Sequence, residues 1–232
     1  MVVLGLTRSA GARARNGGWD VNELTRVWLQ NEYRLPPRFE PDDVIVDIGG
    51  HIGAFAHACL VRGAGRVITC EPEPGNLELL RQNLARWGDR ALIIPAAVWP
   101  SGESTPCLAP PANPYDTCQF SMVFREGGTP VPIIALPEVL DRAGSQVRLL
   151  KLDCEGAEHT ILPNSKLTRV REVCGEAHDS QICGKKVGIS AIIATLGPAW
   201  EIEHIRNGPT TDLWWANRSL QLIDSARSSS RV

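Results

Sequence analysis

The sequence has no surplus of positive charge. Its 232 residues include 24 Lys or Arg and 26 Asp or Glu, which gives a formal net charge of −2. A protein that binds nucleic acid through its phosphates usually carries an excess of basic residues. We therefore expect no nucleic-acid partner.

Long apolar runs are absent as well. No stretch approaches the ~20 apolar residues of a membrane-spanning helix. The apolar part of the N-terminal sequence MVVLGLTRSAGARARNGG spans about six residues, fewer than the ~7–15 of a signal peptide. The seven cysteines are an odd number without a CxxC pair, so neither a disulfide framework nor a zinc knuckle is expected. Together these absences predict a cytoplasmic protein without a membrane partner.

What is present is the composition of an ordinary globular domain, with 43% hydrophobic and 22% charged residues. From Val44 onward, short Val- and Ile-rich segments alternate with helical ones, which is typical of a parallel sheet covered on both faces. The expected strands are 44–49, 66–71, 91–98, 147–153 and 170–178, and the expected helices are 53–63, 74–88, 135–144 and 185–197. Residues 200–206 and 211–218 predict a closing antiparallel hairpin. The predicted fold is α/β, a Rossmann-like doubly wound, mostly parallel seven-stranded sheet with an antiparallel C-terminal hairpin.

The remaining segments divide the chain further. Residues 1–18 and 223–232 are expected to be disordered tails, and 19–40 a cap whose helix runs over 19–35 to Pro36 and lies across the open end of the sheet. The main domain is expected over 41–222. Within it, the many prolines of 99–134 predict a substrate-side insertion with short edge strands, one of them within 118–124.

The segment VIVDIGGHIG places glycines at the turn between the first strand and its helix. Glycine lets the backbone approach a ligand, and a helix N-terminus offers free N–H donors. The dinucleotide pattern GxGxxG does not fit, because its central glycine is replaced by His51 or Ile52. What remains, D-x-G-x-x-x-G, resembles motif I of class I S-adenosylmethionine-dependent methyltransferases. The predicted cofactor-binding residues of this turn are Asp47, Gly49, Gly50, His51 and Gly53.

Acidic residues follow three further strands at the edge where open α/β sheets bind ligands. Glu71, followed by Pro72, stands 22 residues after Gly49, a spacing that suits a carboxylate accepting both ribose hydroxyls. KLDCEGAE and VREVCGEAH bring further polar side chains to the same edge. These are Asp153, Glu155, Glu158, Glu176 and His178.

Four motifs in order, VIVDIGGHIG, ITCEPEPGNLELLRQNL, LLKLDCEGAEHTIL and VCGEAH, resemble the FkbM family of methyltransferases over about residues 40 to 180. The family pattern is DIGA-x-x-G, EP-x-P-x-N, K-x-D-x-EG-x-E and a late E-x-H. This chain departs from it at Gly50, where the family usually carries Ala, and we expect that change only to loosen the turn. The resemblance implies methyl transfer from S-adenosylmethionine to a hydroxyl of a small molecule, a sugar or a polyketide- or peptide-type natural product.

Methyl transfer to an alcohol needs alignment and removal of a proton. His178 is the first candidate for the base, and Asp153 is the alternative base or the group that orients the acceptor. Glu155, Glu158 and Glu176 line the acceptor or, with Asp153 and His178, hold Mg²⁺. Tyr33 and Glu32 are expected to close over the methionine end of the cofactor.

Other histidines are assigned no catalytic role. His51 is expected to point toward the edge of the bound ligand and His57 to pack in a helix, whereas His159 and His204 are expected on the surface. Trp214 and Trp215 are interpreted as core or as the surface of a homodimer. Two rival functions stay open on the same fold, an NAD(P)-dependent oxidoreductase and a non-catalytic partner protein.

Overall fold

The computed structural model describes residues 11–15, 19–101, 107–110, 121–123, 128–144, 146–182 and 185–218. The expected C-terminal tail at 223–232 and most of the central part of the insertion at 99–134 lie outside the described residues. Of the N-terminal tail expected at 1–18, residues 11–15 are described. Arg13 and Arg15 of that segment donate hydrogen bonds to Asn83 and Asn76, so it lies against the helix that carries both asparagines.

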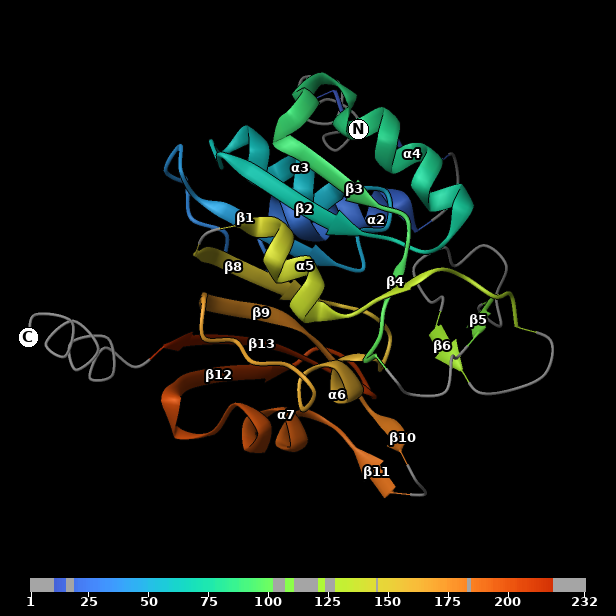
Figure 1. Cartoon of the computed structure of the whole chain (residues 1–232), viewed down its shortest axis with the longest axis vertical. Coiled ribbons are helices and arrows are strands. Elements are labelled where there is room, and N and C mark those ends of the chain that lie inside the picture. Colours follow the sequence, from blue (N-terminus) through green and yellow to red (C-terminus); the bar gives the residue numbers. More distant parts are fainter. Residues whose placement is uncertain are drawn as a thin grey trace, which may run out of the picture.

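A seven-stranded sheet with the order β12-β13-β9-β8-β1-β2-β3 forms the centre of the molecule (Figure 1). The five strands from β9 to β3 run parallel. Strand β13 pairs antiparallel with β9, and β12 pairs antiparallel with β13. Their bounds are Val44–Ile48 (β1), Arg66–Cys70 (β2), Ala91–Ile94 (β3), Val147–Leu152 (β8), Val170–His178 (β9), Trp200–Arg206 (β12) and Thr211–Arg218 (β13). This confirms the predicted mostly parallel, doubly wound sheet with its C-terminal hairpin.

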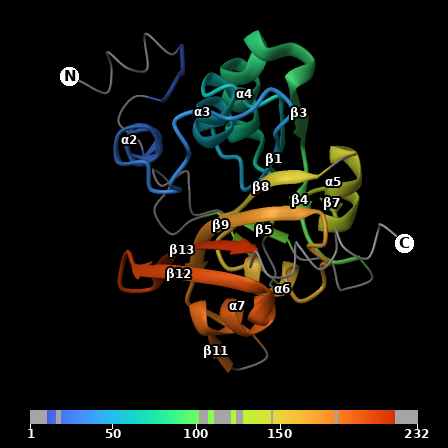
Figure 2. The same ribbon diagram turned by 90° about the vertical axis from the view of Figure 1, so that its left-hand side faces the viewer.

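Helices cover both faces of the sheet. The central strands are apolar in almost continuous runs, and because successive side chains point to opposite faces, both faces need a cover. Ile45 of β1 packs with the helices α2 (Asp20–Thr25), α3 (Ala54–Val61) and α4 (Pro74–Leu84). Val46 and Ile48 face the opposite side, with α5 (Leu136–Ala143), α6 (Glu158–Ile161) and α7 (Ile189–Leu196). Figure 2 shows α2 and α3 on one side of the sheet and α5 on the other.

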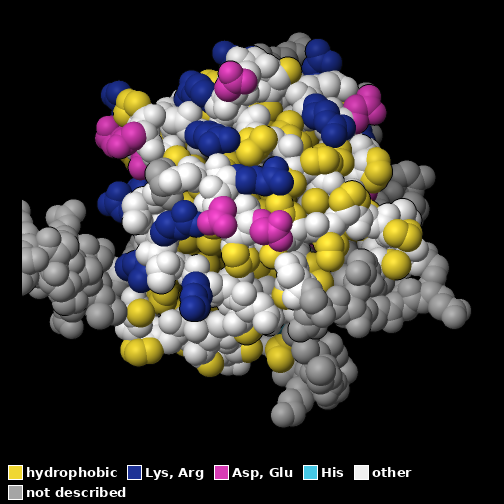
Figure 3. Space-filling view, viewed as in Figure 1, with side chains coloured by type: hydrophobic (Ala, Val, Ile, Leu, Met, Phe, Trp, Pro, Cys, Tyr) yellow, Lys and Arg dark blue, Asp and Glu magenta, His cyan; other side chains and the backbone are white. Residues whose placement is uncertain are grey.

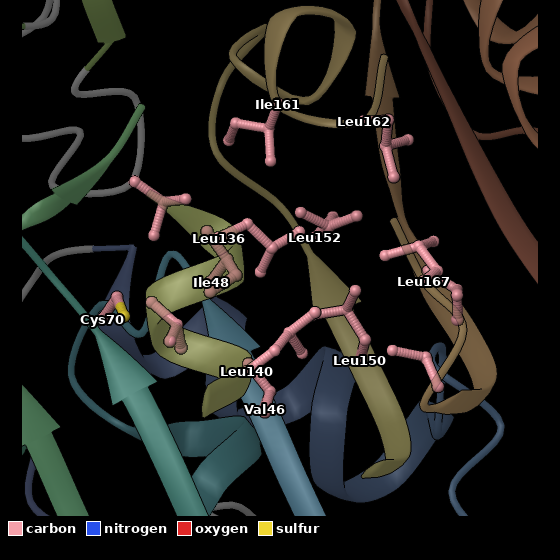
Figure 4. Close-up of a cluster of buried hydrophobic side chains, with 14 of the residues drawn as sticks. Val46, Ile48, Cys70, Leu136, Leu140, Leu150, Leu152, Ile161, Leu162 and Leu167 are labelled. Atoms are coloured by element: carbon pink, nitrogen blue, oxygen red, sulfur yellow. The ribbon is translucent and has the colours of Figure 1, made fainter. Parts of the chain in front are cut away.

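The second of these faces is drawn in Figure 4, where Leu136 and Leu140 of α5 point toward Val46, Ile48 and the leucines of β8. Trp214 and Trp215 are neighbours on β13 and are buried on opposite faces. Their interpretation as core residues is therefore confirmed.

Several element boundaries differ from the sequence prediction. The helix expected over 19–35 stops at Gln30, as α2 followed by a π-helical turn (Arg26–Gln30), because Asn31 adopts a left-handed conformation with φ 49°. The helix expected over 74–88 is α-helical only to Leu84 and ends in a 3₁₀ segment (Ala85–Arg90).

Two other predicted elements are divided. The strand expected over 91–98 breaks at Pro95, which has no N–H for the ladder, and its second part β4 (Ala97–Val98) pairs with β7 (Ile133–Ile134) in a separate sheet. The helix expected over 185–197 begins only at Ile189, since β11 (Lys185–Val187) pairs with β10 (Ser180–Ile182). In the insertion, β5 (Cys107–Ala109) pairs with β6 (Ser121–Val123), which falls within the strand expected at 118–124.

The surface charge of the face in Figure 3 is mixed, with Asp and Glu side chains among the Lys and Arg. Within the described residues, no helix combines the length and the apolar character that crossing a bilayer requires.

Candidate active site

The glycine turn after β1 is held against the ends of two neighbouring strands. Gly49 and Gly50 donate their backbone N–H groups to the carbonyl of Cys70, at 3.1 and 2.9 Å. A Cβ on Gly49, whose φ is 83°, would lie 1.9 Å from the backbone oxygen of Asp153. Only glycine therefore fits where the turn meets the end of β8.

Glu71, at the end of β2, is tied to that turn. Its Oε2 accepts a hydrogen bond of 2.8 Å from the N–H of His51, and its Oε1 accepts one of 2.8 Å from the N–H of Glu73. The side chain is buried, which raises the pKa of its carboxyl group. Oε1 also accepts a hydrogen bond of 3.5 Å from Nδ2 of Asn76. Oε2 keeps a second lone pair, which can accept a hydrogen bond from a ligand hydroxyl.

Asp47 lies beneath the turn and is fully buried. Its carboxylate is 3.2 Å from Nζ of Lys151 and accepts a hydrogen bond of 3.1 Å from the hydroxyl of Thr69. It does not line the cavity described below. Any effect of Asp47 on a bound ligand therefore acts through its buried partners.

Asp153 follows β8 on the other side of the turn. The hydroxyl of Tyr33 donates a hydrogen bond of 2.8 Å to its Oδ2, and Nζ of Lys151 lies 3.7 Å from the same oxygen. Burial by itself would raise the pKa of Asp153, but Lys151 and His178 outweigh it and the pKa is lowered. Asp153 is thus a carboxylate at neutral pH.

His178 ends β9 within a ring of acids. Its Nδ1 lies 3.2 Å from Oε1 of Glu158, and its Nε2 lies 3.4 Å from Glu155 and 3.5 Å from Glu176. Although burial favours the neutral ring, the hydrogen bond that His178 donates to Glu158 and the surrounding carboxylates raise the pKa of His178 to about 9. The ring is therefore an imidazolium at neutral pH.

Arg26, the first residue of the π-helical turn, reaches across to this ring of acids. Its guanidinium contacts Glu176, lies 2.6 Å from Glu32 and lies 3.9 Å from Glu23. Burial and the neighbouring Glu23 raise the pKa of Glu32 to about 7. Arg26 and Glu23 escaped the sequence analysis because no motif connects the first helix with β9, 150 residues away.

One cavity opens at the carboxyl ends of β1, β2 and β8, between the glycine turn and the acids. Its polar lining consists of Glu23, Arg26, His51, Glu71, Asn76, Asp153, Glu155 and Glu176, and its apolar lining includes Ile48, Cys70, Pro72, Ala96, Ala97, Val98, Leu108 and Ala157. The structure thus brings together Gly49, His51, Glu71, Pro72, Asp153, Glu155 and Glu176 from the predicted site. The other predicted residues are not part of this lining, namely Asp47, Gly50, Gly53, Tyr33, Glu158 and His178.

Two non-glycine residues of the lining have left-handed backbones, His51 with φ 47° and Glu155 with φ 55°. Such conformations cost on the order of 1–3 kcal/mol and cluster at active and ligand-binding sites. Neither is visible in the sequence, since both follow from how the turns are packed.

Of the remaining histidines, His57 packs between Trp28 and Trp87, as predicted. The prediction that His159 lies on the surface is wrong. It is buried, and its Nε2 donates a hydrogen bond of 2.7 Å to the carbonyl of His178, which holds the end of β9 against α6. His204 is on the surface as expected, 3.5 Å from Asp212.

The oxygens of Asp153 and Glu176 and a nitrogen of His178 lie within 4.8 Å of one another, close enough for one divalent ion. Glu176 is also in contact with Arg26. A metal bound there would place a second cation beside the guanidinium, which disfavours its binding.

A family model described as the methyltransferase FkbM domain matches residues 47–204, more than half of the chain. A hexuronic acid methyltransferase, AglP of Haloferax volcanii, is 27% identical in an alignment 171 residues long that covers 68% of this chain and 69% of that protein. The residues matched by the family model include the glycine turn, Glu71 and the acidic segment after β8.

Two solved structures are similar in backbone. A precorrin-6y C5,15-methyltransferase from Geobacter metallireducens GS-15 is 13% identical with a TM-score of 0.49, over 90% of this chain and 93% of that one. The TrmK of M. capricolum, solved with S-adenosyl-homocysteine, is 10% identical with a TM-score of 0.48, over 82% and 67%. Since both TM-scores lie below 0.5, the fold is assigned from the strand order of this chain itself. By the match of the FkbM domain to most of its length, the chain belongs to the FkbM methyltransferase family and is an S-adenosylmethionine-dependent methyltransferase.

Proposed function

We propose that this methyltransferase transfers the methyl group to a hydroxyl group of a small molecule, and that the reaction takes place in the cavity at the carboxyl ends of β1, β2 and β8. The observation that supports this most directly is the pairing of two walls in one cavity. Gly49, His51 and Glu71 form the wall suited to a nucleoside, and Asp153, Glu155 and Glu176 form an acidic wall opposite.

The first wall fits S-adenosylmethionine. Gly49 contributes its backbone to the cavity lining, and Oε2 of Glu71 presents an acceptor position for a ribose hydroxyl. The apolar lining from Cys70 to Val98 is suited to the adenine ring. When bound, the cofactor supplies an electrophilic methyl group on a positively charged sulfur, and the carboxylates of the second wall favour that charge.

Asp153 is the base that we assign to the reaction. Asp153 lines the cavity, whereas His178 is not part of the lining and is already protonated at neutral pH. Tyr33 fixes the Asp153 carboxylate by a hydrogen bond. An acceptor hydroxyl bound to the free oxygen of Asp153 can give up its proton there as the new C–O bond forms.

A sugar is the acceptor class that we favour. The hydroxyls of a sugar can donate hydrogen bonds to carboxylates such as those of Glu155 and Glu176. The similar protein of Haloferax volcanii is described as acting on a hexuronic acid, another sugar. A sugar acid offers a carboxyl group as well as hydroxyls, so the experiment has to tell the two positions apart.

The test uses the full chain with methyl-labelled S-adenosylmethionine and a panel of neutral sugars, uronic acids and glycans. A methyl ether survives mild alkali, whereas a methyl ester is cleaved and releases methanol. We expect alkali-stable label on a sugar, abolished or strongly reduced in Asp153→Asn and retained in the surface variant Glu78→Gln. Release of the label by alkali, or transfer to nitrogen, would contradict the assignment to a hydroxyl.

A further inference from the structure

Lys151 occupies the interior of the site without touching the cavity. It lies on β8 with only 2% of its surface exposed. Its Nζ donates a hydrogen bond of 2.9 Å to the carbonyl of Gly49 and lies 3.2 Å from Asp47 and 3.7 Å from Asp153. Neither the proposed cofactor contacts nor the proposed base includes this residue.

The three partners belong to different parts of the site. Gly49 is in the turn that forms the cofactor wall, Asp47 is on β1 beneath it, and Asp153 is the base on the opposite wall. The hydroxyl of Thr69 extends the same network to β2 through Asp47. The ammonium group of Lys151 therefore contacts both the wall that contains Gly49 and the wall that contains Asp153.

The charge of Glu23 also acts on the Lys151 ammonium. Two aromatic rings lie near the same group, because its Nζ is 5.4 Å from the ring centre of Tyr33 and 5.6 Å from that of Phe55. Tyr33 in turn donates to Asp153. The direction of the Asp153 carboxylate is thus set by Lys151 and by Tyr33, whose ring packs on the Lys151 ammonium.

A buried ion pair is poor evidence of stabilisation, because apolar residues of similar volume often serve as well or better. If Lys151 served only to neutralise the buried charge of Asp47, the ion pair between these two residues would be sufficient. Its Nζ also contacts the carbonyl of Gly49 and the carboxylate of Asp153, and these contacts indicate a further role.

We propose that Lys151 is a positioning residue, which orients the cofactor turn through the Gly49 carbonyl and the reacting carboxylate through Asp153. This inference rests on the proposed function of Asp153. It requires that cofactor binding and the rate of methyl transfer both depend on a residue that contacts neither ligand.

The main test compares Lys151→Met with the double variant Asp47→Asn/Lys151→Met and with Lys166→Met, an exposed lysine, as the matched control. We expect Lys166→Met to behave as wild type. Lys151→Met alone leaves Asp47 buried without its cation and should lower the melting temperature, and the double variant should recover most of that loss because neither charge remains.

The positioning role predicts that the double variant stays impaired despite its recovered stability. Its dissociation constant for S-adenosylhomocysteine should rise about tenfold or more, as expected from the lost hydrogen bond to Gly49. Its kcat at saturating cofactor and acceptor should fall roughly 10²-fold, because Asp153 loses its orientation. A stable double variant with wild-type kcat would overturn the proposal, and so would a change confined to cofactor affinity.

A second measurement keeps Lys151 in place, for the case that its removal prevents folding. Asp47→Asn should lower kcat in the wild-type background and should have a smaller effect in a Tyr33→Phe background, where the Asp153 carboxylate has already lost one of the contacts that orient it. Additive effects would mean that no coupling passes through Lys151 and would overturn the proposal. Whether the methyl group is transferred to a hydroxyl is tested separately, on the product of the wild-type protein. A wrong hydroxyl assignment can therefore be told apart from a wrong role for Lys151.

Discussion

Gly50 and Thr69 are packed so closely that a Cβ on residue 50 would lie 2.2 Å from the Thr69 hydroxyl oxygen. That hydroxyl cannot simply turn away, because it donates a hydrogen bond of 3.1 Å to the buried carboxylate of Asp47. From the sequence, Gly50 in place of the family's usual Ala was expected only to loosen the turn. The structure gives a different reason. Glycine at position 50 leaves space for the side chain of Thr69, whose hydroxyl donates a hydrogen bond to Asp47.

This relationship predicts a specific rescue. Gly50→Ala should destabilise the protein by about 1–3 kcal/mol, the typical cost of overpacking. Thr69→Ala alone should cost about 1 kcal/mol for its lost hydrogen bond. The double variant should be more stable than the sum of the two losses implies, since the clash is gone. Thermal unfolding of the four proteins measures this coupling, and strict additivity would show that the two residues do not compete for space.

The ribose role of Glu71 leads to a second prediction. Glu71→Gln keeps the shape of the side chain but replaces one acceptor oxygen with an NH₂ group, which then faces a backbone N–H or a ligand hydroxyl. We expect binding of S-adenosylhomocysteine to weaken by about 1–3 kcal/mol. Glu78→Gln, on the exposed side of α4, is the matched control. Calorimetry that gives the same affinity for wild type and Glu71→Gln would remove Glu71 from the cofactor site.

The sequence predicted the parallel sheet and the glycine turn well, since apolar strands and turn glycines follow from local rules. Glu71 and Asp153 were found for the same reason, because each directly follows a recognisable strand. Arg26 was not found, and Lys151, although it begins the motif KLDCEGAE, was given no role. Their roles depend on contacts with Glu176 and with Gly49, residues far away in the chain, and a lysine inside an apolar strand gives no indication of which carboxylates it meets.

His159 shows the opposite kind of error. With no partner recognisable in the sequence, it was assigned to the surface, yet it donates to the carbonyl of His178. A backbone carbonyl is present at every residue and leaves no mark in the sequence. Such side-chain contacts with backbone are therefore the part of a site that sequence reasoning cannot supply.

Metal dependence is a third point that can be tested. The Arg26 guanidinium at Glu176 leads us to expect activity without a divalent ion. Methyl transfer should be unchanged, within a factor of about two, after EDTA treatment and should not rise when Mg²⁺ is restored. Loss of activity in EDTA with full recovery in Mg²⁺ would instead place an ion between Asp153, Glu176 and His178.

The pKa of His178 predicts how stability depends on pH. It is raised from 6.5 to about 9 in the folded protein, chiefly because hydrogen bonding to Glu158 and the nearby charges outweigh burial. A raised pKa means that the folded state holds the proton more tightly than the unfolded state does. The resulting stabilisation is complete below about pH 6.5 and is lost as pH rises through about 9.

Comparison of wild type with His178→Gln isolates this contribution. The difference between their free energies of unfolding should shrink by on the order of 3 kcal/mol between pH 6 and pH 9.5, in buffer containing EDTA. His204→Gln is the control, because its imidazole is 43% exposed and its partner Asp212 keeps the ion pair with Arg206. Urea titrations at several pH values measure the effect. If the wild-type and His178→Gln curves run parallel across this range, the carboxylates around His178 do not hold its proton, and a neutral ring would again be available as a base.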